Sequence, residues 1–222
     1  MHRQIEPGIL YFGTPVVLIG TANPDGTSNL APMSSAFWLG WRGVLGLAAA
    51  SRTTENLRRT RQCTLNLPSH DMADAVDRLA LTTGSDPVPA NKRARGYRHA
   101  ADKFGLARLT PAASETIAAP GVAECPVRME AVVEAIHPMA ADDPAQAGAR
   151  CVVEVRIQRV HAAEAILMAG HENRVDPDAW RPLIMSFQRF YGLGGSAGPS
   201  ALASIPEAMY RGPDIERARL AA

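Results

Sequence analysis

The sequence predicts a mainly β fold, a barrel of short strands with short helices on its flanks. Apolar residues alternate, or run without interruption, over short segments typical of strands, whereas helical spacing is confined to a few stretches. With 18 Gly and 17 Pro among 222 residues, the chain also has the many turns that such a fold needs. It contains no internal repeats, and its length suits one large domain with at most a small accessory piece.

Composition and charge exclude several classes of protein. Apolar residues make up 46% and charged residues 20%, which argues against disorder. Because 23 basic residues stand against 22 acidic ones, the formal charge is +1 and no nucleic-acid partner is expected. The longest apolar stretch, residues 37–50, is interrupted by Arg42 and by glycines, so it is shorter than the roughly 20 apolar residues of a spanning helix. The N-terminal residues lack the apolar region of a signal peptide.

The cysteines predict neither a disulfide framework nor a metal site. Cys63, Cys125 and Cys151 are widely spaced and form no C-x-x-C pair. His161 and His171 have no partner at ligand spacing. We therefore expect a cytoplasmic protein without a membrane span and without a bound metal.

The first half of the chain alternates strands and turns. Residues 15–21 predict a strand that enters a hairpin at the turn NPDG, and residues 27–31 predict the return strand. Residues 32–41 are expected to form a loop with small hydroxyl and aromatic side chains. Residues 43–50 predict a buried strand, in which two glycines leave the backbone open to a ligand or to another backbone.

Helical signals follow this strand. Residues 51–61 combine hydroxyl caps, an acidic first turn and a basic last turn, which is the charge order that a helix favours. After a short strand at 63–67, residues 69–80 have the apolar spacing of an amphipathic helix. Residues 81–98 predict a polar surface loop, and residues 100–106 predict one or two helical turns closed by a glycine.

The second half predicts two half-buried strands. Apolar residues alternate over 127–133 and again over 151–157, with a polar loop at 138–148 between them. Residues 163–169 are interpreted as a further strand. The loop-like tail ends in a short polar helix at 215–220.

The segment SRTTEN, residues 51–56, has the features of a phosphate site. A helix N-terminus offers unpaired amides and a positive dipole end, to which Arg52 and the hydroxyls would add donors. The alternative is plain capping by Thr53 or Thr54, which explains the hydroxyls but not Arg52. A cation at that end is unfavourable unless an anion lies beside it.

Taken in chain order, these segments resemble the flavin reductase-like, FMN-binding split-barrel family. The family pattern is a strand, a D-G hairpin, N-x-A-P-x-S, a strand, S-x-x-T-x-x-N and a short N-L-P strand. It is carried here by PVVLIGTANPDGTSNLAPMSSAFWLGWRGVLGLAAASRTTENLRRTRQCTLNLPS, with later landmarks ADKFGL, ECPVRMEA and WRPLIMSFQRFYGLG. The resemblance covers residues 9–195. It implies a single flavin reductase-like domain over 1–222, with a C-terminal tail at 196–222.

The resemblance also implies a site for FMN. The N-x-A-P-x-S loop would line the isoalloxazine ring, and the S-x-x-T turn with its helix would hold the phosphate. Lys103 of the D-K-F motif would reach the flavin and stabilise its anionic reduced form, although a solvated helix lysine is the alternative. Tyr191 would cover the cofactor, or else belong to the core or to a dimer contact. The implied cofactor-binding residues are Asn29, Pro32, Met33, Ser34, Ser35, Ser51, Arg52, Thr53, Thr54, Asn56, Lys103 and Tyr191.

One departure from the family concerns the reductant. Many relatives carry a G-D-H loop whose histidine lies near the nicotinamide, and the corresponding residues here are Gly148, Ala149 and Arg150. Arg150 would either meet a pyridine-nucleotide phosphate or be a strand-edge arginine. NAD(P)H turnover is therefore less firmly implied than FMN binding.

The resulting expectation is an FMN-dependent oxidoreductase. A hydride from NADH or NADPH would pass through the bound FMN to a free flavin, a metal complex or another small-molecule acceptor, with no general acid or base assigned. Two alternatives are a flavin-binding electron-transfer protein without NAD(P)H turnover and a split-barrel protein that binds heme or another cofactor. The cluster Phe37, Trp38, Leu39 and Trp41 predicts an apolar interface, and hence a homodimer.

Overall fold

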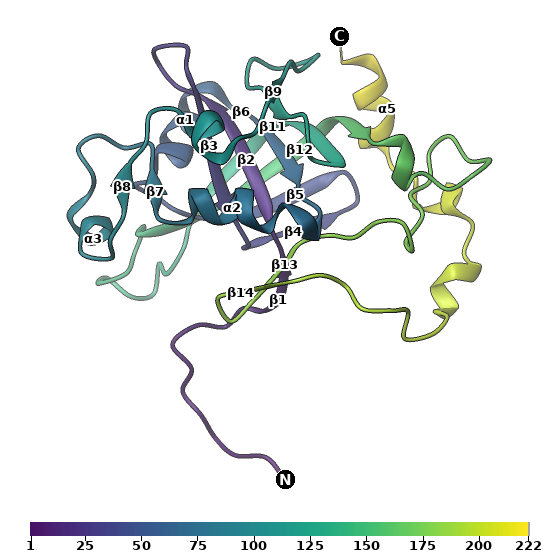
Figure 1. The fold of residues 1–222 in the computed structure, drawn as a ribbon, viewed down its shortest axis with the longest axis horizontal. Helices are drawn as coiled ribbons and strands as arrows, with labels where there is room; N and C mark the ends of the chain where they lie inside the picture. The colour runs from purple at the N-terminus through teal and green to yellow at the C-terminus, as the bar shows by residue number, and fades with distance from the viewer. Residues whose placement is uncertain (222) are drawn as a thin grey trace.

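The computed structural model describes residues 1–221 and confirms the mainly β fold (Figure 1). Its centre is a seven-stranded antiparallel sheet with the strand order β3-β2-β6-β11-β12-β5-β4. These strands are β2 (Val17–Ala22), β3 (Ser28–Met33), β4 (Ala36–Leu39), β5 (Arg42–Ala48), β6 (Gln62–Leu67), β11 (Val127–Pro138) and β12 (Arg150–Ala162).

The sheet curls into a split barrel whose two edges meet at a pair of serines. β3 and β4 stand at opposite ends of the strand order, yet only Ser34 and Ser35 separate them in the chain. The carbonyl of Ser35 accepts a hydrogen bond of 2.7 Å from the amide of Gly46 on β5. Over the described residues β3 does not pair with β4, so the barrel is split at this seam rather than closed by hydrogen bonds.

Period-two alternation gives the sheet two buried faces. On β2, Val17 and Ile19 point into the barrel interior, where they pack with side chains such as Leu45 and Val153. Leu18 points to the other face and joins a second apolar cluster. That cluster lies under α2 (Ala73–Ala80) and α4 (Lys103–Ala107), and it includes Leu30, Val76, Leu79 and Phe104.

The helices follow the local sequence signals. α1 (Arg52–Thr60) ends at Arg61, which adopts φ 57° in the left-handed region. α2 follows a 3₁₀ turn at His70–Met72. α4 begins at Asp102, whose carboxylate accepts a hydrogen bond of 2.8 Å from the amide of Gly105. The expected closure at Gly105 is wrong, because this glycine lies within α4 and donates to the capping carboxylate of Asp102, whereas Arg108, with φ 55°, ends the helix.

Three other sequence predictions are corrected. Residues 32–41 are not a loop but contain the end of β3 and all of β4, because the chain at this point crosses from one sheet edge to the other. Residues 163–169 contain a 3₁₀ turn, Glu164–Ile166, instead of a strand. Residues 81–98 are partly buried: β7 (Thr82–Thr83) pairs in parallel with β8 (Arg98–His99), and α3 (Ala90–Arg93) lies between them in the chain.

Smaller elements complete the molecule. β1 (Phe12–Pro15), β13 (Ile184–Ser186) and β14 (Arg189–Tyr191) form a separate sheet, and β9 (Pro111–Ala112) pairs with β10 (Gly121–Val122). In Figure 1 the N-terminal residues extend away from the barrel. None of the helices within residues 1–221 has the length and apolar character to cross a membrane.

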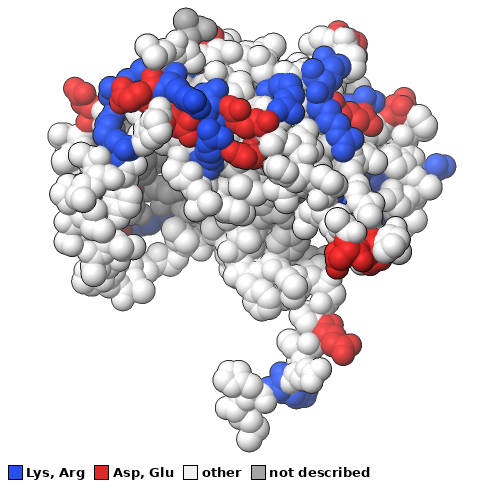
Figure 2. Space-filling model, turned by 180° about the vertical axis from the view of Figure 1, so that it is seen from behind, with Lys and Arg blue, Asp and Glu red and all other residues white. Residues whose placement is uncertain are grey.

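The tail returns to the barrel through α5 (Pro213–Leu220), which confirms the predicted C-terminal helix. Asp214 at its start pairs with Arg42 of β5 at 2.9 Å, and Arg42 also pairs with Glu154 of β12 at 2.6 Å. Figure 2 shows basic and acidic side chains together in a band across the upper part of the face opposite to Figure 1. Basic residues on this face therefore have carboxylates close by.

Candidate functional site

A cavity of about 600 Å³ lies at the seam of the barrel. β3 contributes Pro32 and Met33 to its wall, and Phe37 of β4 and Val44 of β5 face it from the other side of the seam. The hydroxyl of Tyr11 lies 3.0 Å from that of Ser35, so one polar contact crosses an otherwise apolar wall. This part of the cavity suits a flat, largely apolar group with a few polar edge atoms.

The other part of the cavity is polar, and its residues are joined by hydrogen bonds. The amide of Asn29 donates to the hydroxyl of Thr53 at 3.2 Å, and Nε of Arg52 donates to the carbonyl of Gly84 at 3.2 Å. Gly84 is required at this point, because a Cβ there would lie 2.5 Å from Oδ1 of Asn29. The loop after α2 is thus held directly against the start of α1.

The N-terminus of α1 combines capping with free donors. Oγ of Ser51 accepts from the amide of Thr54 at 3.1 Å, and the Thr54 hydroxyl donates to the carbonyl of Ala48 at 2.9 Å. These two residues therefore cap the helix. The amides of Arg52 and Thr53 lie ahead of the capped position, where a helix has no internal acceptor for them. Two amides therefore remain available to an anion in the cavity.

Arg52 already has an anion beside it. Its Nη1 lies 3.0 Å from Oε2 of Glu55, one turn further along α1. A cation at a helix N-terminus needs an anion beside it, and Glu55 of the same helix supplies that anion. Arg52 by itself therefore no longer indicates a bound phosphate.

Lys103 is the side chain that most requires a ligand. It is only 2% exposed, it lines the cavity, and among residues 1–221 its Nζ has a single hydrogen bond, of 3.5 Å, to the carbonyl of Leu30. Burial, and next the charge of Lys92, lower the pKa of Lys103 to about 8. A buried ammonium without a carboxylate partner is costly, and a bound anion would offset that cost.

The whole cavity shares this excess of positive charge. Its lining includes Arg52, Lys92, Arg95, Lys103 and Arg150, and no aspartate or glutamate. The band in Figure 2 mixes basic and acidic side chains, whereas the cavity lining is basic only. The cavity is therefore suited to an anionic ligand.

Comparison with known proteins shows the family of the chain. The flavin reductase like domain matches residues 9–194. The chain belongs to this family. It is similar to YdfE, an uncharacterized protein of Bacillus subtilis, with 35% identity over 196 residues that cover 88% of this chain and 91% of that one.

Solved structures share the fold of this flavin reductase-like chain. Flavoredoxin of Desulfovibrio vulgaris aligns with a TM-score of 0.72 and 20% identity, covering 92% of this chain and 100% of that one. Nitrilotriacetate monooxygenase component B from Bacillus cereus aligns with a TM-score of 0.67 and 22% identity, covering 85% and 88% of the two chains. The predicted resemblance to the split-barrel flavin reductases is thus confirmed.

The structure brings most of the predicted site residues of this flavin reductase-like chain together around one cavity. Those that line it are Asn29, Pro32, Met33, Ser35, Ser51, Arg52, Thr53, Lys103 and Arg150. Four others do not line it: Ser34, Thr54, Asn56 and Tyr191. Asn56 is buried and donates to Thr21 and Asn23, so it fastens α1 to the neighbouring hairpin. Tyr191 lies on β14 and is about half exposed. Contact of these four with a cofactor stays a prediction.

Sequence reasoning missed the contribution of the loop after α2. Thr83, Gly84, Lys92, Arg95 and Tyr97 all line the cavity of this flavin reductase-like protein. The basic run in this loop resembles a solvated surface segment. The available signal was the spacing of Lys92 and Arg95, three residues apart, which places both on one side of a helical turn.

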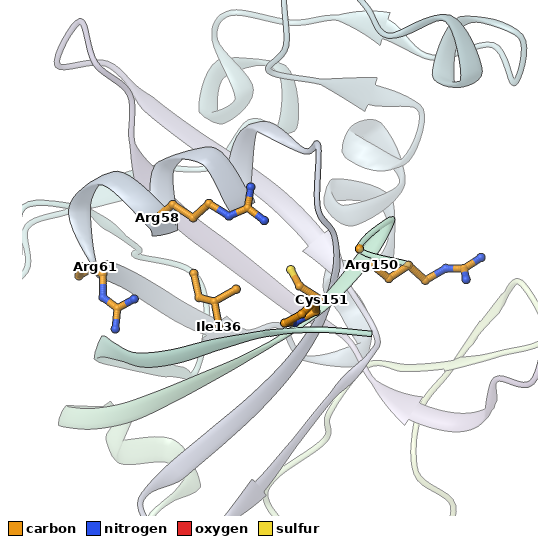
Figure 3. A pocket seen from close by; sticks show the side chains of 7 residues that line it. Arg58, Arg61, Ile136, Arg150 and Cys151 are labelled. Carbon is orange, nitrogen blue, oxygen red and sulfur yellow. The ribbon is translucent and has the colours of Figure 1, made fainter. Parts of the chain in front are cut away.

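A second, smaller hollow of about 450 Å³ lies at the other end of α1 (Figure 3). Arg58 and Arg61 extend from α1 over Ile136, whereas Arg150 points away from them. Arg61 donates to the carbonyl of Glu134 at 2.7 Å. The C-terminus of a helix itself favours basic residues, so no bound ligand is needed to explain these arginines.

Proposed function

We propose that the protein is an FMN-binding oxidoreductase that takes reducing equivalents from NADH or NADPH and delivers them to a small-molecule acceptor. The observation that carries the proposal is Lys103, a buried ammonium without a carboxylate partner that faces the cavity. Membership of the flavin reductase like family supplies the class of ligand. The cavity fits that class, since it joins an apolar part to a cationic part.

The residues present suit the two parts of a flavin nucleotide. Pro32, Met33 and Tyr11 would border the ring, and the hydroxyl of Ser35 would offer a polar contact at its edge. The free amides at the start of α1, together with Lys103, would hold the phosphate. When bound, the flavin supplies the redox chemistry, accepting a hydride and passing electrons on.

The chain itself would bind and orient the flavin and would exclude water from the site. The cavity lining contains no histidine, aspartate or glutamate, so we assign no general acid or base. The ammonium of Lys103 would stabilise negative charge on the flavin nucleotide, an electrostatic role that grows in a water-poor site. Arg150, at the start of β12, lines the same cavity and donates to Gln146 at 3.3 Å. We propose it as a contact for the phosphates of the reductant.

A second candidate function is electron transfer without NAD(P)H turnover. It is favoured by Gly148, Ala149 and Arg150, which stand where many relatives have a loop histidine beside the nicotinamide. The experiment that separates the two begins with the visible absorption spectrum of the purified protein and chromatography of the cofactor released by heat. FMN in the supernatant supports the proposal, and FAD, heme or no cofactor after reconstitution contradicts it. Steady-state oxidation of NADH and NADPH by the loaded protein then distinguishes a reductase from an electron carrier.

We also propose a homodimer in which the partner borders the cavity. Phe37 and Leu39 of β4 are exposed, and Phe37 also lines the cavity. Trp38 and Trp41, which the sequence placed in the same patch, instead pack against the barrel core. The apolar surface at the seam is therefore narrower than expected, and β4 is the element that we expect a second copy to cover.

A further inference from the structure

The smaller hollow at the C-terminal end of α1 combines an apolar floor with a cationic rim. Its volume is about 450 Å³, and among residues 1–221 no aspartate or glutamate lines it. Arg58 and Arg61 extend over Ile136 (Figure 3), and Cys151 adds further apolar surface. Arg150 is the one residue of the described chain that lines both this hollow and the cavity at the seam, and it points away from the other two arginines. The two sites are therefore distinct.

The positive charge at this hollow is not neutralised by the described chain. Arg58 and Arg61 are three residues apart, so two like charges are neighbours at the last turn of α1. Among the ion pairs of residues 1–221, none involves either arginine. The carbonyl of Glu134 accepts a hydrogen bond of 2.7 Å from Nη2 of Arg61, but the carboxylate of Glu134 pairs with Arg156 at 2.7 Å. The helix end accounts for the sign of the charge, and not for its place above an apolar floor.

The backbone fixes the position of Arg61. Its φ of 57° lies in the left-handed region, where glycine is the less strained residue. Its amide donates to the carbonyl of Leu57 at 3.1 Å, and its carbonyl accepts from the amide of Val133 on β11 at 2.8 Å. The bond from Nη2 to Glu134 then holds the guanidinium itself. A guanidinium fixed by one N–H group still presents the others as a fork for an oxyanion.

The lining suits binding rather than catalysis. Apart from the arginines it consists of Ile136, Pro138, Gly148 and Cys151, and the Cys151 side chain is buried. None of these residues is an ordinary acid or base at neutral pH. A small inorganic anion would use the rim and leave the apolar floor in water, whereas an anion with an apolar body would use both.

We propose that this hollow binds a small organic carboxylate, with the carboxylate on Arg58 and Arg61 and the apolar body against Ile136 and Pro138. This site lies outside the cavity proposed for the flavin, and the inference does not depend on the proposed function.

The test is an NMR titration of the purified protein with three probes. Benzoate should bind with a Kd on the order of a millimolar or tighter. Benzamide keeps the ring and loses the charge, and acetate keeps the charge and loses the ring, so each should bind at least about tenfold more weakly.

Variants of α1 then locate the bound benzoate. Arg58→Gln and Arg61→Gln should each weaken benzoate binding about tenfold, through loss of a charge-assisted hydrogen bond. Arg59→Gln is the matched control, because Arg59 is in the same turn but donates to the carbonyl of Ala22 and does not line the hollow. Its affinity should change less than about twofold, since an exposed charge that does not contact the ligand is screened. A thermal melt of each variant checks the fold, and Arg58 is exposed, so its replacement should leave the melt unchanged.

Lys103→Met distinguishes the hollow from the cavity at the seam and should leave benzoate binding unchanged. Loss of benzoate binding in Lys103→Met, with no loss in Arg58→Gln, would assign the probe to the cavity at the seam and overturn the inference. Equal affinities for benzoate and acetate would show a bare anion contact, and equal weakening by Arg59→Gln would show a general attraction to the helix end; either result overturns it. Absence of benzoate binding to the wild-type protein would overturn it as well. Each of these results leaves the proposed flavin function standing.

Discussion

Nη1 of Arg52 lies 3.0 Å from the carboxylate of Glu55, one turn along α1. This pair occupies the helix end at which a phosphate was expected to meet Arg52. Because Nε of Arg52 also donates to the carbonyl of Gly84, the guanidinium ties α1 to the loop after α2. A buried cation that faces the cavity is instead Lys103, which reaches it from α4.

We therefore expect Arg52→Ala to weaken FMN binding less than about fivefold, because the guanidinium is held by Glu55 and the carbonyl of Gly84 and acts on the phosphate only as a screened nearby charge. A charge-assisted hydrogen bond from Arg52 to the phosphate would instead make the loss about tenfold to a hundredfold. Fluorescence titration of the apoprotein measures the affinity, and a thermal melt checks the fold. A hundredfold loss would show that Arg52 leaves Glu55 when the phosphate binds.

The contrast between Arg52 and Lys92 shows what the sequence could predict. Strand alternation, the cap of α1 and the ordered family motifs are local signals, so the barrel strands and most of the cavity wall followed from them. The pairing of Arg52 with Glu55 was a local signal that was missed, because residues three apart on a helix are neighbours. The position of Lys92 is a tertiary fact, since nothing local shows that the parallel pairing of β7 with β8 folds Lys92 over the cavity. The β4 strand was missed for the same reason, since its pairing with β5 outweighs its loop-like composition.

Lys103→Met should separate cofactor binding from stability. Methionine keeps most of the volume of the side chain but removes the charge, so FMN affinity should fall about tenfold to a hundredfold. The flavin-free variant should melt no lower than wild type, because a buried ammonium without a carboxylate partner no longer has to be desolvated. Titration and calorimetry on the same preparations measure the two effects. A lower melting temperature with unchanged FMN affinity would make Lys103 a purely structural residue.

The same lysine predicts a pH dependence of binding. Burial, and then Lys92, lower the pKa of Lys103 to about 8 in the flavin-free protein, and a bound phosphate would raise that pKa again. FMN affinity should therefore be level between about pH 7 and pH 8, where the phosphate is a dianion, and fall above pH 8, as binding becomes coupled to proton uptake. Titrations at a series of pH values should show this slope in wild type and lose it in Lys103→Met. A level profile in both proteins would mean that the phosphate does not meet Lys103.

The pKa of Lys103 also fixes the sign of a stability effect. Between about pH 8 and the ordinary lysine pKa of 10.5, the unfolded chain binds the proton that the native apoprotein has released. Stability rises with pH wherever the unfolded state binds more protons. The free energy of unfolding of the wild-type apoprotein should therefore rise with pH across this window, relative to that of Lys103→Met. Denaturant melts of the two apoproteins at both ends of the window measure the free energy of unfolding of wild type minus that of the variant, and a value that falls or stays constant with rising pH would contradict the prediction.

The final prediction concerns the exposed face of β4. Leu39 is 71% exposed and Phe37, two residues earlier on the same face, lines the cavity, so a partner that covers Leu39 would also border the site. We expect Leu39→Asp to release monomers and to lower flavin occupancy together, because a buried carboxylate without a partner is incompatible with an apolar interface. Leu81→Asp is the control, since Leu81 at the end of α2 is exposed and does not line the cavity. Light scattering gives the mass and absorbance gives the flavin content. A wild-type protein that is monomeric and fully loaded with flavin at micromolar concentration would exclude the dimer.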